Sequence, residues 1–148
     1  MLIVTPADFN ASPTAASTLL QWVRSTDGQQ VDDHGECALS LMPRDDELVL
    51  VLPPRALSWH RIALPRVNSA RLRAALDGLL EDRVLGDVEA LHHALAPGGR
   101  PGETVWVASC DKQRLRAWVH LLEKSGRSVS RIAPSLWPLL ESPVPVAP

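Results

Sequence analysis

The sequence predicts an α/β fold in which helices pack on a mixed sheet. Short apolar runs bounded by Pro and Gly recur along the chain, as strands do, and two longer stretches repeat apolar residues at helical spacing. Their order is several strands, a helix, two strands, a helix and a last strand, which suits a layered α/β domain. A chain of 148 residues, 45% of them hydrophobic, can bury such a core without disulfides or metals.

The first half of the chain reads as strands. They are expected at Leu2–Pro6, Ser17–Ser25, Gly35–Leu41, Glu47–Pro54 and Ala56–Pro65. The run Glu47–Pro54 is apolar on both faces, as a strand inside a covered sheet would be. We expect Ala56–Pro65 to pair with it across a tight turn at Pro53 and Pro54.

A helix is expected from Ser69 to about Asp82, with Asn68 or Ser69 as its N-cap. Its apolar stripe consists of Leu72, Ala75, Leu76, Leu79 and Leu80. Three charged residues at four-residue spacing, Arg73, Asp77 and Glu81, are expected to form favourable pairs on the opposite, solvated face.

The second half is expected to contain strands at Ala90–Leu95 and Glu103–Cys110, separated by a Gly/Pro loop. A helix then runs from the N-cap Asp111 to Ser125, with Gly126 as its stop and Leu115, Trp118, Val119 and Leu122 as its buried stripe. The last strand is Ser128–Pro134. Residues 135–148 are Pro-rich and are expected to be a linker or the truncated start of a second lobe.

The sequence contains no pattern that predicts a catalytic or metal site. His92 and His93 are adjacent in an expected strand, so their side chains point to opposite faces, and we expect one inside and one in water. Cys37 and Cys110 fit no zinc pattern, and Cys110 is expected to be a small buried residue. No Gly-rich phosphate cradle and no nucleophile elbow is present. The chain is therefore not expected to be an enzyme, and no cofactor is expected.

The net charge and the hydropathy of the chain argue against two kinds of partner, nucleic acid and the lipid bilayer. A formal net charge of -2 and a pI near 6.2 argue against a nucleic-acid surface. No run approaches the about 18 to 20 apolar residues that span a bilayer, and no signal peptide precedes the domain, so a soluble chain is expected.

From Leu48 onward the chain resembles the cytoplasmic domain of the type II secretion system protein L family. The resemblance rests on an ordered series: "LVLVLP", "RIALP", the helix "RLRAALDGLLEDRVLGDVEALHHAL", the strand "VWVASC", the helix "LRAWVHLLEKSG" and the ending "IAPSLWPLL". It covers about two-thirds of the chain. It implies an actin-like, RNase-H-type fold, with residues 1–134 as the first lobe of the cytoplasmic domain.

The resemblance also implies a role. The family is a scaffold whose cytoplasmic part recruits the secretion ATPase, protein E, through that protein's N-terminal domain, and which works with platform proteins M and F. It implies a place on the cytoplasmic face of the bacterial inner membrane, reached through a transmembrane helix that this chain lacks, and it implies a homodimer as a further assembly. Actin-like ATPases carry a DxG phosphate loop between their first two strands. Here that region reads "VTPADFNASP", which lacks the motif.

The partner-binding residues expected from the sequence are acidic: Asp77, Glu81, Asp82, Asp87 and Glu89. Such a surface could steer a basic partner and set its orientation. An ordinary helix-to-strand connection with solvated charges is the competing interpretation, and a partner strand added to an exposed sheet edge is another. The alternative functions are an actin-like platform protein of pilus assembly and a nucleotide-binding switch.

Overall fold

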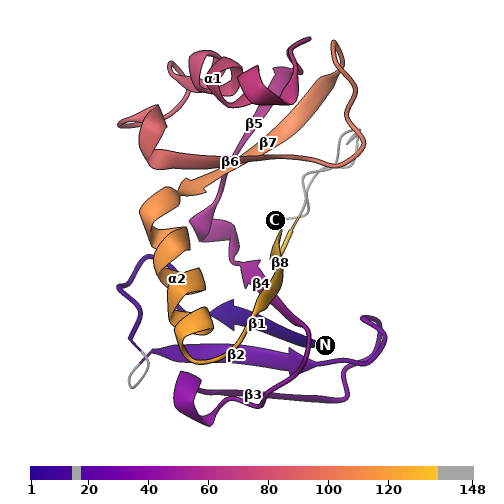
Figure 1. Cartoon of the computed structure of the whole chain (residues 1–148), viewed down its shortest axis with the longest axis vertical. Coiled ribbons are helices and arrows are strands. Elements are labelled where there is room, and N and C mark those ends of the chain that lie inside the picture. The colour runs from indigo at the N-terminus through magenta and orange to yellow at the C-terminus, as the bar shows by residue number, and fades with distance from the viewer. Residues whose placement is uncertain (15–17, 137–148) are drawn as a thin grey trace, which may run out of the picture. The chain divides into compact units, whose positions relative to one another are not determined.

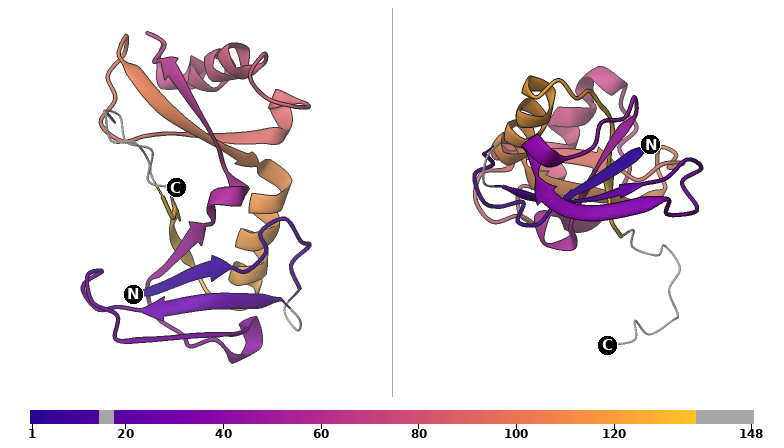
Figure 2. Two further views of the ribbon diagram at one scale, coloured as in Figure 1. Left: turned by 180° about the vertical axis from the view of Figure 1, so that it is seen from behind. Right: turned by 90° about the horizontal axis from the view of Figure 1, so that it is seen from below.

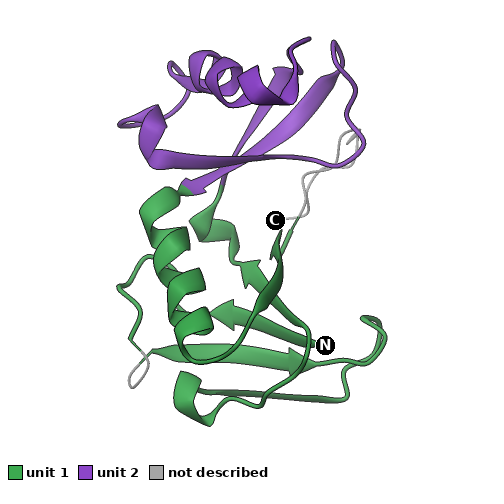
Figure 3. Cartoon of the chain, viewed as in Figure 1, with its two compact units in different colours: residues 1–57, 111–136 green, residues 58–110, 137–148 purple. Residues whose placement is uncertain are grey.

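The structure, a computed structural model, describes residues 1–14 and 18–136. These residues form two compact units: one of residues 1–57 and 111–136, the other of residues 58–110 (Figure 3). The linker expected at 135–148 lies outside the described residues from 137 onward, and so does Ser17, the first residue of the second expected strand.

The first unit is built on a five-stranded mixed sheet with the order β3-β2-β1-β4-β8 (Figures 1 and 2). Its strands are β1 (Leu2–Pro6), β2 (Leu19–Arg24), β3 (Asp33–Ala38), β4 (Leu48–Leu52) and β8 (Val129–Pro134). The strands β1, β2 and β3 form an antiparallel meander, while β4 pairs in parallel with both β1 and β8. One outer strand of this sheet is therefore β3 and the other is β8.

Alternation along these strands defines the core of the first unit. Register places the buried side chains of Leu2 and Val4 beside Leu48 and Leu50, on one face of the sheet. Helix α2 (Lys112–Lys124) contributes its own buried stripe, Leu115, Trp118 and Leu122. Its first turn is capped as the sequence predicts, because the side chain of Asp111 accepts from the backbone N–H of Arg114 at 2.8 Å.

The second unit has a three-stranded sheet with the order β5-β7-β6. The strands are β5 (Ser58–Ala63), β6 (Leu91–Leu95) and β7 (Thr104–Asp111), and helix α1 (Ser69–Leu80) begins at the N-cap Asn68. One cluster joins helix and sheet: Ile62, Leu64, Leu76, Leu80, Val105 and Val107. Three short 3-10 turns complete the described elements: η1 (Leu39–Leu41), η2 (Pro54–Ala56) and η3 (Val88–Ala90).

Two sequence predictions about packing are wrong. β4 does not pair with β5: β4 lies in the five-stranded sheet and β5 in the three-stranded one, and the 3-10 turn η2 follows Pro53 where the sequence predicted a tight hairpin turn. Leu79 is 45% exposed, so the buried stripe of α1 is narrower than expected and centres on Leu76 and Leu80. Apolar periodicity predicts which residues of one element lie on the same face. It does not predict which strand will pair with that element, or how wide a stripe of a helix will be buried.

Candidate functional site

The acidic segment that the sequence singled out forms the end of α1 and the connection to β6. Glu81 occupies the C-cap of α1, and Asp82 follows it in a turn. Asp87 caps η3 by accepting from the backbone N–H of Glu89 at 3.0 Å. These four carboxylates, from Glu81, Asp82, Asp87 and Glu89, are all on exposed residues. We call them the acidic connection.

The position of the acidic connection is unfavourable for the helix that it follows. The C-terminal end of a helix carries partial negative charge, and no basic residue occupies the last turn of α1. Carboxylates at Glu81 and Asp82 therefore oppose the helix dipole by roughly 0.3 to 1 kcal/mol each. Helix stability does not explain why acidic residues stand there.

Asp77, the fifth predicted partner-binding residue, lies in a different environment. Its side chain is 23% exposed, and its carboxylate lies 3.2 Å from Nε of Arg73 and 3.1 Å from Nε2 of His93. The pairing with Arg73 at four-residue spacing is as predicted, but the face is not solvated: Arg73 also donates to the carbonyl oxygen of Leu91 at 2.6 Å. Asp77 thus joins α1 to β6, and only the other four carboxylates form an open surface.

His93 links this carboxylate to the third strand of the unit. Its Nδ1 lies 2.7 Å from Oγ of Ser109 in β7, and its side chain is 1% exposed, while His92 is exposed. The expectation of one buried and one solvated histidine is confirmed. Burial lowers the pKa of His93, and the guanidinium of Arg73 lowers it further, whereas the carboxylate of Asp77 acts in the opposite direction. The folded environment therefore favours the neutral ring of His93 more than water does.

The three side chains Asp77, His93 and Ser109 contain the groups of a hydrolase triad, but their arrangement is not one. In a triad the imidazole presents Nε2 to the serine and Nδ1 to the carboxylate, and here the two nitrogens are exchanged. Ser109 is 1% exposed, so no substrate carbonyl can reach its hydroxyl. The network satisfies buried polar groups and fastens α1, β6 and β7 together. Sequence reasoning missed it because its members are 16 residues apart on three elements.

The connection between β1 and β2, where an actin-like ATPase carries its phosphate loop, is anchored by aromatic packing. Phe9 is 2% exposed and stacks on Trp118 of α2, with ring centroids 6.5 Å apart. The indole N–H of Trp118 donates to the carbonyl oxygen of Phe9 at 3.0 Å. Residues 7–18 contain no glycine, whereas phosphate cradles use glycine to bring backbone N–H groups close to the anion.

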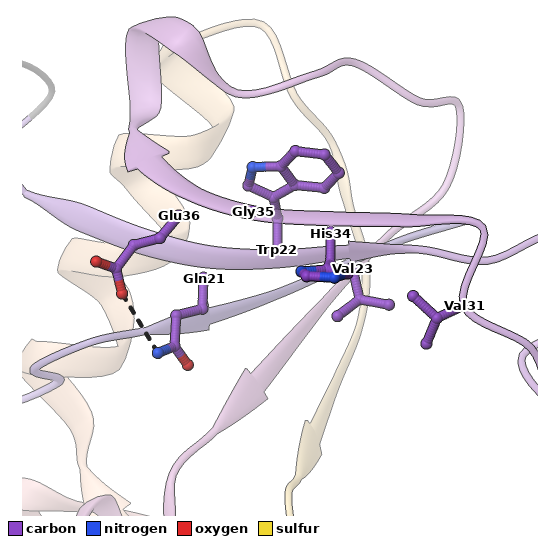
Figure 4. A pocket seen from close by; sticks show the side chains of 7 residues that line it. All are labelled: Gln21, Trp22, Val23, Val31, His34, Gly35 and Glu36. Atoms are coloured by element: carbon purple, nitrogen blue, oxygen red, sulfur yellow. Dashed lines mark hydrogen bonds between the residues drawn. The ribbon is translucent and has the colours of Figure 1, made fainter.

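Described residues of the first unit line depressions at its surface, two of which involve charged side chains. One, of about 450 Å³, lies over β2 and β3 beside Val23, Val31, His34 and Glu36 (Figure 4). The other, of about 370 Å³, lies at the end of α2, beside Arg44 and Arg127. Arg44 donates to the carbonyl oxygen of Ser125, and Arg127, which is 7% exposed, donates to that of Met42. The two arginines therefore tie the end of α2 and the residues that follow it to the segment 42–44.

The described residues, 1–14 and 18–136, contain neither a metal-binding cluster nor a membrane-spanning helix. No group of three or more His, Cys, Asp and Glu side chains there is placed to hold a metal ion. Within the same residues, the helices are too short and too polar to cross a lipid bilayer.

Comparison with known families decides the class of the chain. The model of the family described as type II secretion system (T2SS), protein L, matches residues 12–140. The chain belongs to this family. Membership confirms the resemblance found in the sequence and places the chain in a family of the type II secretion machinery.

Two relatives in the protein L family show how much of it the chain represents. The protein L of Klebsiella pneumoniae is 29% identical over 136 residues, which cover 89% of this chain and 34% of that protein. The protein L of Dickeya chrysanthemi is 31% identical over 90 residues, covering 61% of this chain and 22% of the relative. The chain thus spans about a third or less of the length of these relatives.

Solved structures confirm the fold class. The cytoplasmic domain of EpsL, an inner-membrane component of the type II secretion system of Vibrio cholerae, superimposes with a TM-score of 0.62 at 26% identity, covering 90% of this chain and 57% of that one. A PilM–PilN type IV pilus biogenesis complex contains a chain of the same fold, with a TM-score of 0.53 at 15% identity, covering 91% of this chain and 46% of that one. The predicted α/β fold, in which helices pack on mixed sheets, is therefore correct.

Proposed function

We propose that this protein L chain is a non-catalytic docking module of the type II secretion platform, and that the acidic connection recruits the N-terminal domain of the secretion ATPase, protein E. In this proposal the chain lies at the cytoplasmic face of the inner membrane and works beside platform proteins M and F. The observation that carries the proposal is the group of four exposed carboxylates within nine residues of a family member.

The energetics of the acidic connection support a binding role. Because Glu81 and Asp82 oppose the dipole of α1, their charge weakens the fold and is best explained by a partner. The backbone beneath them is held in place: Arg83, the next residue, donates from Nη1 to the carbonyl oxygen of Arg61 at 2.7 Å. A positioned negative surface increases the rate of encounter with a basic partner and fixes its orientation.

The connection between β1 and β2 supports the non-catalytic part of the proposal. The ring of Phe9 stacks on Trp118, and the carbonyl oxygen of Phe9 accepts a hydrogen bond from the indole N–H of Trp118. The local backbone is therefore anchored to the core. A nucleotide switch would need this segment to present N–H groups to phosphates. The packing favours a binding module over an actin-like ATPase.

The test is a calorimetric titration of this chain with the N-terminal domain of the cognate ATPase, with Mg-ATP titrated separately. The binding variant reverses three charges: Glu81→Lys, Asp82→Lys and Asp87→Lys. A matched control changes the net charge equally at exposed acids elsewhere: Asp46→Lys, Glu103→Lys and Glu123→Lys.

We expect the ATPase domain to bind the wild type and the control, and to bind the acidic-connection variant at least about tenfold more weakly, with no heat from Mg-ATP. The unfolding temperature of that variant should change little, because lysine suits the C-terminal end of α1 while Asp87→Lys removes the cap of η3. If both triple variants bind the ATPase domain equally weakly, the loss of binding comes from the change in net charge and not from the acidic connection. Heat from Mg-ATP would exclude the non-catalytic assignment.

A further inference from the structure

Two arginines converge on one residue just beyond α2, in the first unit. Arg44 donates from Nη2 to the carbonyl oxygen of Ser125 at 3.0 Å, and Arg127 donates from Nη1 to the hydroxyl oxygen of the same residue at 3.1 Å. Gly126 lies between them in the chain, with a φ of +87°, and a Cβ at this position would lie 3.2 Å from Nη1 of Arg44. The glycine therefore leaves the space that the guanidinium of Arg44 occupies.

The guanidinium of Arg127 is buried, and it uses only part of its donor capacity. The residue is 7% exposed, and no carboxylate of residues 1–14 and 18–136 lies within 4.0 Å of it. Besides its bond to Ser125, it donates from Nη2 to the carbonyl oxygen of Met42 at 2.6 Å, while its buried Nε has no hydrogen-bond partner among the described residues. Buried charges in proteins are ordinarily paired. Arg127 therefore retains both a positive charge and a donor that an anionic ligand would satisfy.

Capping of α2 does not account for both arginines. The C-terminal end of a helix carries a partial negative charge of roughly half an elementary charge, and Lys124 already places a cation in the last turn. Within the described residues, Arg44 makes its side-chain hydrogen bond from Nη2, so that Nε and Nη1 of this exposed residue face solvent. Burial lowers the pKa of Arg127, and the charge of Arg44 lowers it further, whereas Cys37 acts in the opposite direction. The two cations thus repel each other.

The depression of about 370 Å³ opens at these arginines. Its lining consists of Arg44, Asp45, Asp46, Gly126, Arg127 and Ser128. The carboxylate of Asp45 is paired elsewhere, with the N-terminal amino group at 3.1 Å and with Nε of Arg24 at 4.0 Å. Ligand pockets have volumes of roughly 300 to 1,000 Å³, so this depression suits a small ligand.

We propose that Arg44 and Arg127 bind a small oxyanion of the phosphate class in this depression. Guanidinium groups match phosphate oxygens in bidentate pairs, and a phosphate group carries about −1.5 to −2 charge near neutral pH, which balances two arginines. Ser128, exposed in the lining, adds a hydroxyl donor. Asp46 and Glu47 are exposed next to Arg44 in sequence and repel an extended anionic surface. The ligand is therefore a free anion and not the headgroup of a lipid bilayer.

NMR titration of the ¹⁵N-labelled full chain with inorganic phosphate, at an ionic strength held constant with sodium chloride, tests the site. We expect saturable shifts of the Gly126 and Ser128 amides and of the Nε–H of Arg127, with a dissociation constant on the order of 1 mM. Arg44→Gln removes one of the two cations from an exposed side chain and should raise that constant at least about fivefold. The matched control Arg116→Gln removes the same charge from an exposed position of α2 and should leave it within about twofold.

Two further arms fix the sign and the source of the ligand. Asp46→Asn removes a negative charge from the lining and should strengthen phosphate binding, because like charges repel. Vesicles of phosphatidylcholine and phosphatidylglycerol should not capture the chain in a manner that depends on Arg44. Arg127 is left unchanged in every variant, because its buried side chain supports the fold.

Four results would overturn the proposal. They are the absence of saturable shifts up to about 20 mM phosphate, an Arg44→Gln variant that binds like the wild type, weaker binding by Asp46→Asn, and vesicle capture that Arg44→Gln abolishes. Amide shifts away from the depression confirm that each variant is folded. The titration contains no ATPase domain, and the acidic connection lies in the other unit, so the outcome is independent of the proposed docking function.

Discussion

Replacing Asp77 with alanine separates its structural role from the partner-binding role that the sequence predicted. Its carboxylate accepts from Nε2 of His93, whose side chain is 1% exposed, and pairs with Arg73. Asp82 provides the matched control, because it lies five residues further along and is exposed.

The magnitude follows from these contacts. A hydrogen bond from a buried ring to a charged acceptor contributes about 1.5 to 3 kcal/mol. The Arg73 pair contributes about 0 to 1 kcal/mol, because that side chain is 39% exposed and solvent screens the charge. Asp77→Ala should therefore lower the free energy of unfolding by about 1.5 to 4 kcal/mol, and Asp82→Ala by less than about 0.5 kcal/mol.

Urea unfolding followed by tryptophan fluorescence measures both values, and titration with the ATPase domain is repeated under conditions where each variant is folded. Folded Asp77→Ala should bind the ATPase domain as the wild type does. If Asp77→Ala is as stable as Asp82→Ala, the network does not stabilise the unit. If it is folded and yet fails to bind, Asp77 belongs to the docking surface.

Two further predictions concern the pH dependence of stability and the contact that anchors the connection between β1 and β2. Burial and nearby cations lower the folded-state pKa of both His93 and His60, so below about pH 6.5 the unfolded chain binds more protons than the folded one. Stability should fall as the pH drops from about 6.5 toward the folded-state pKa values; urea midpoints that stay flat from about pH 7 to about pH 5 would contradict this. Trp118→Phe retains an aromatic ring but leaves the carbonyl oxygen of Phe9 without its donor, and should lower the free energy of unfolding by about 2 kcal/mol. An equal loss on replacing half-buried Trp22 with phenylalanine would show that this hydrogen bond is not the reason.

Local patterns predicted most of the elements. The strand and helix positions, the cap at Asp111 and the burial of Trp118 all follow from alternation, helical spacing and capping chemistry within short windows of sequence. The exposure of Glu81 and Asp82 was predictable too, because charged residues beyond a helix end remain in water.

Contacts between distant segments were decided by the tertiary structure alone. The sequence determined that one of His92 and His93 is buried, but not that Asp77 and Ser109 would meet it, since 16 residues separate each of them from His93. The assignment of β4 and β5 to different sheets is of the same kind. Periodicity specifies the face on which a side chain lies, because it follows from backbone geometry within one element. The choice of neighbour depends on how elements pack, and that is a property of the assembled fold.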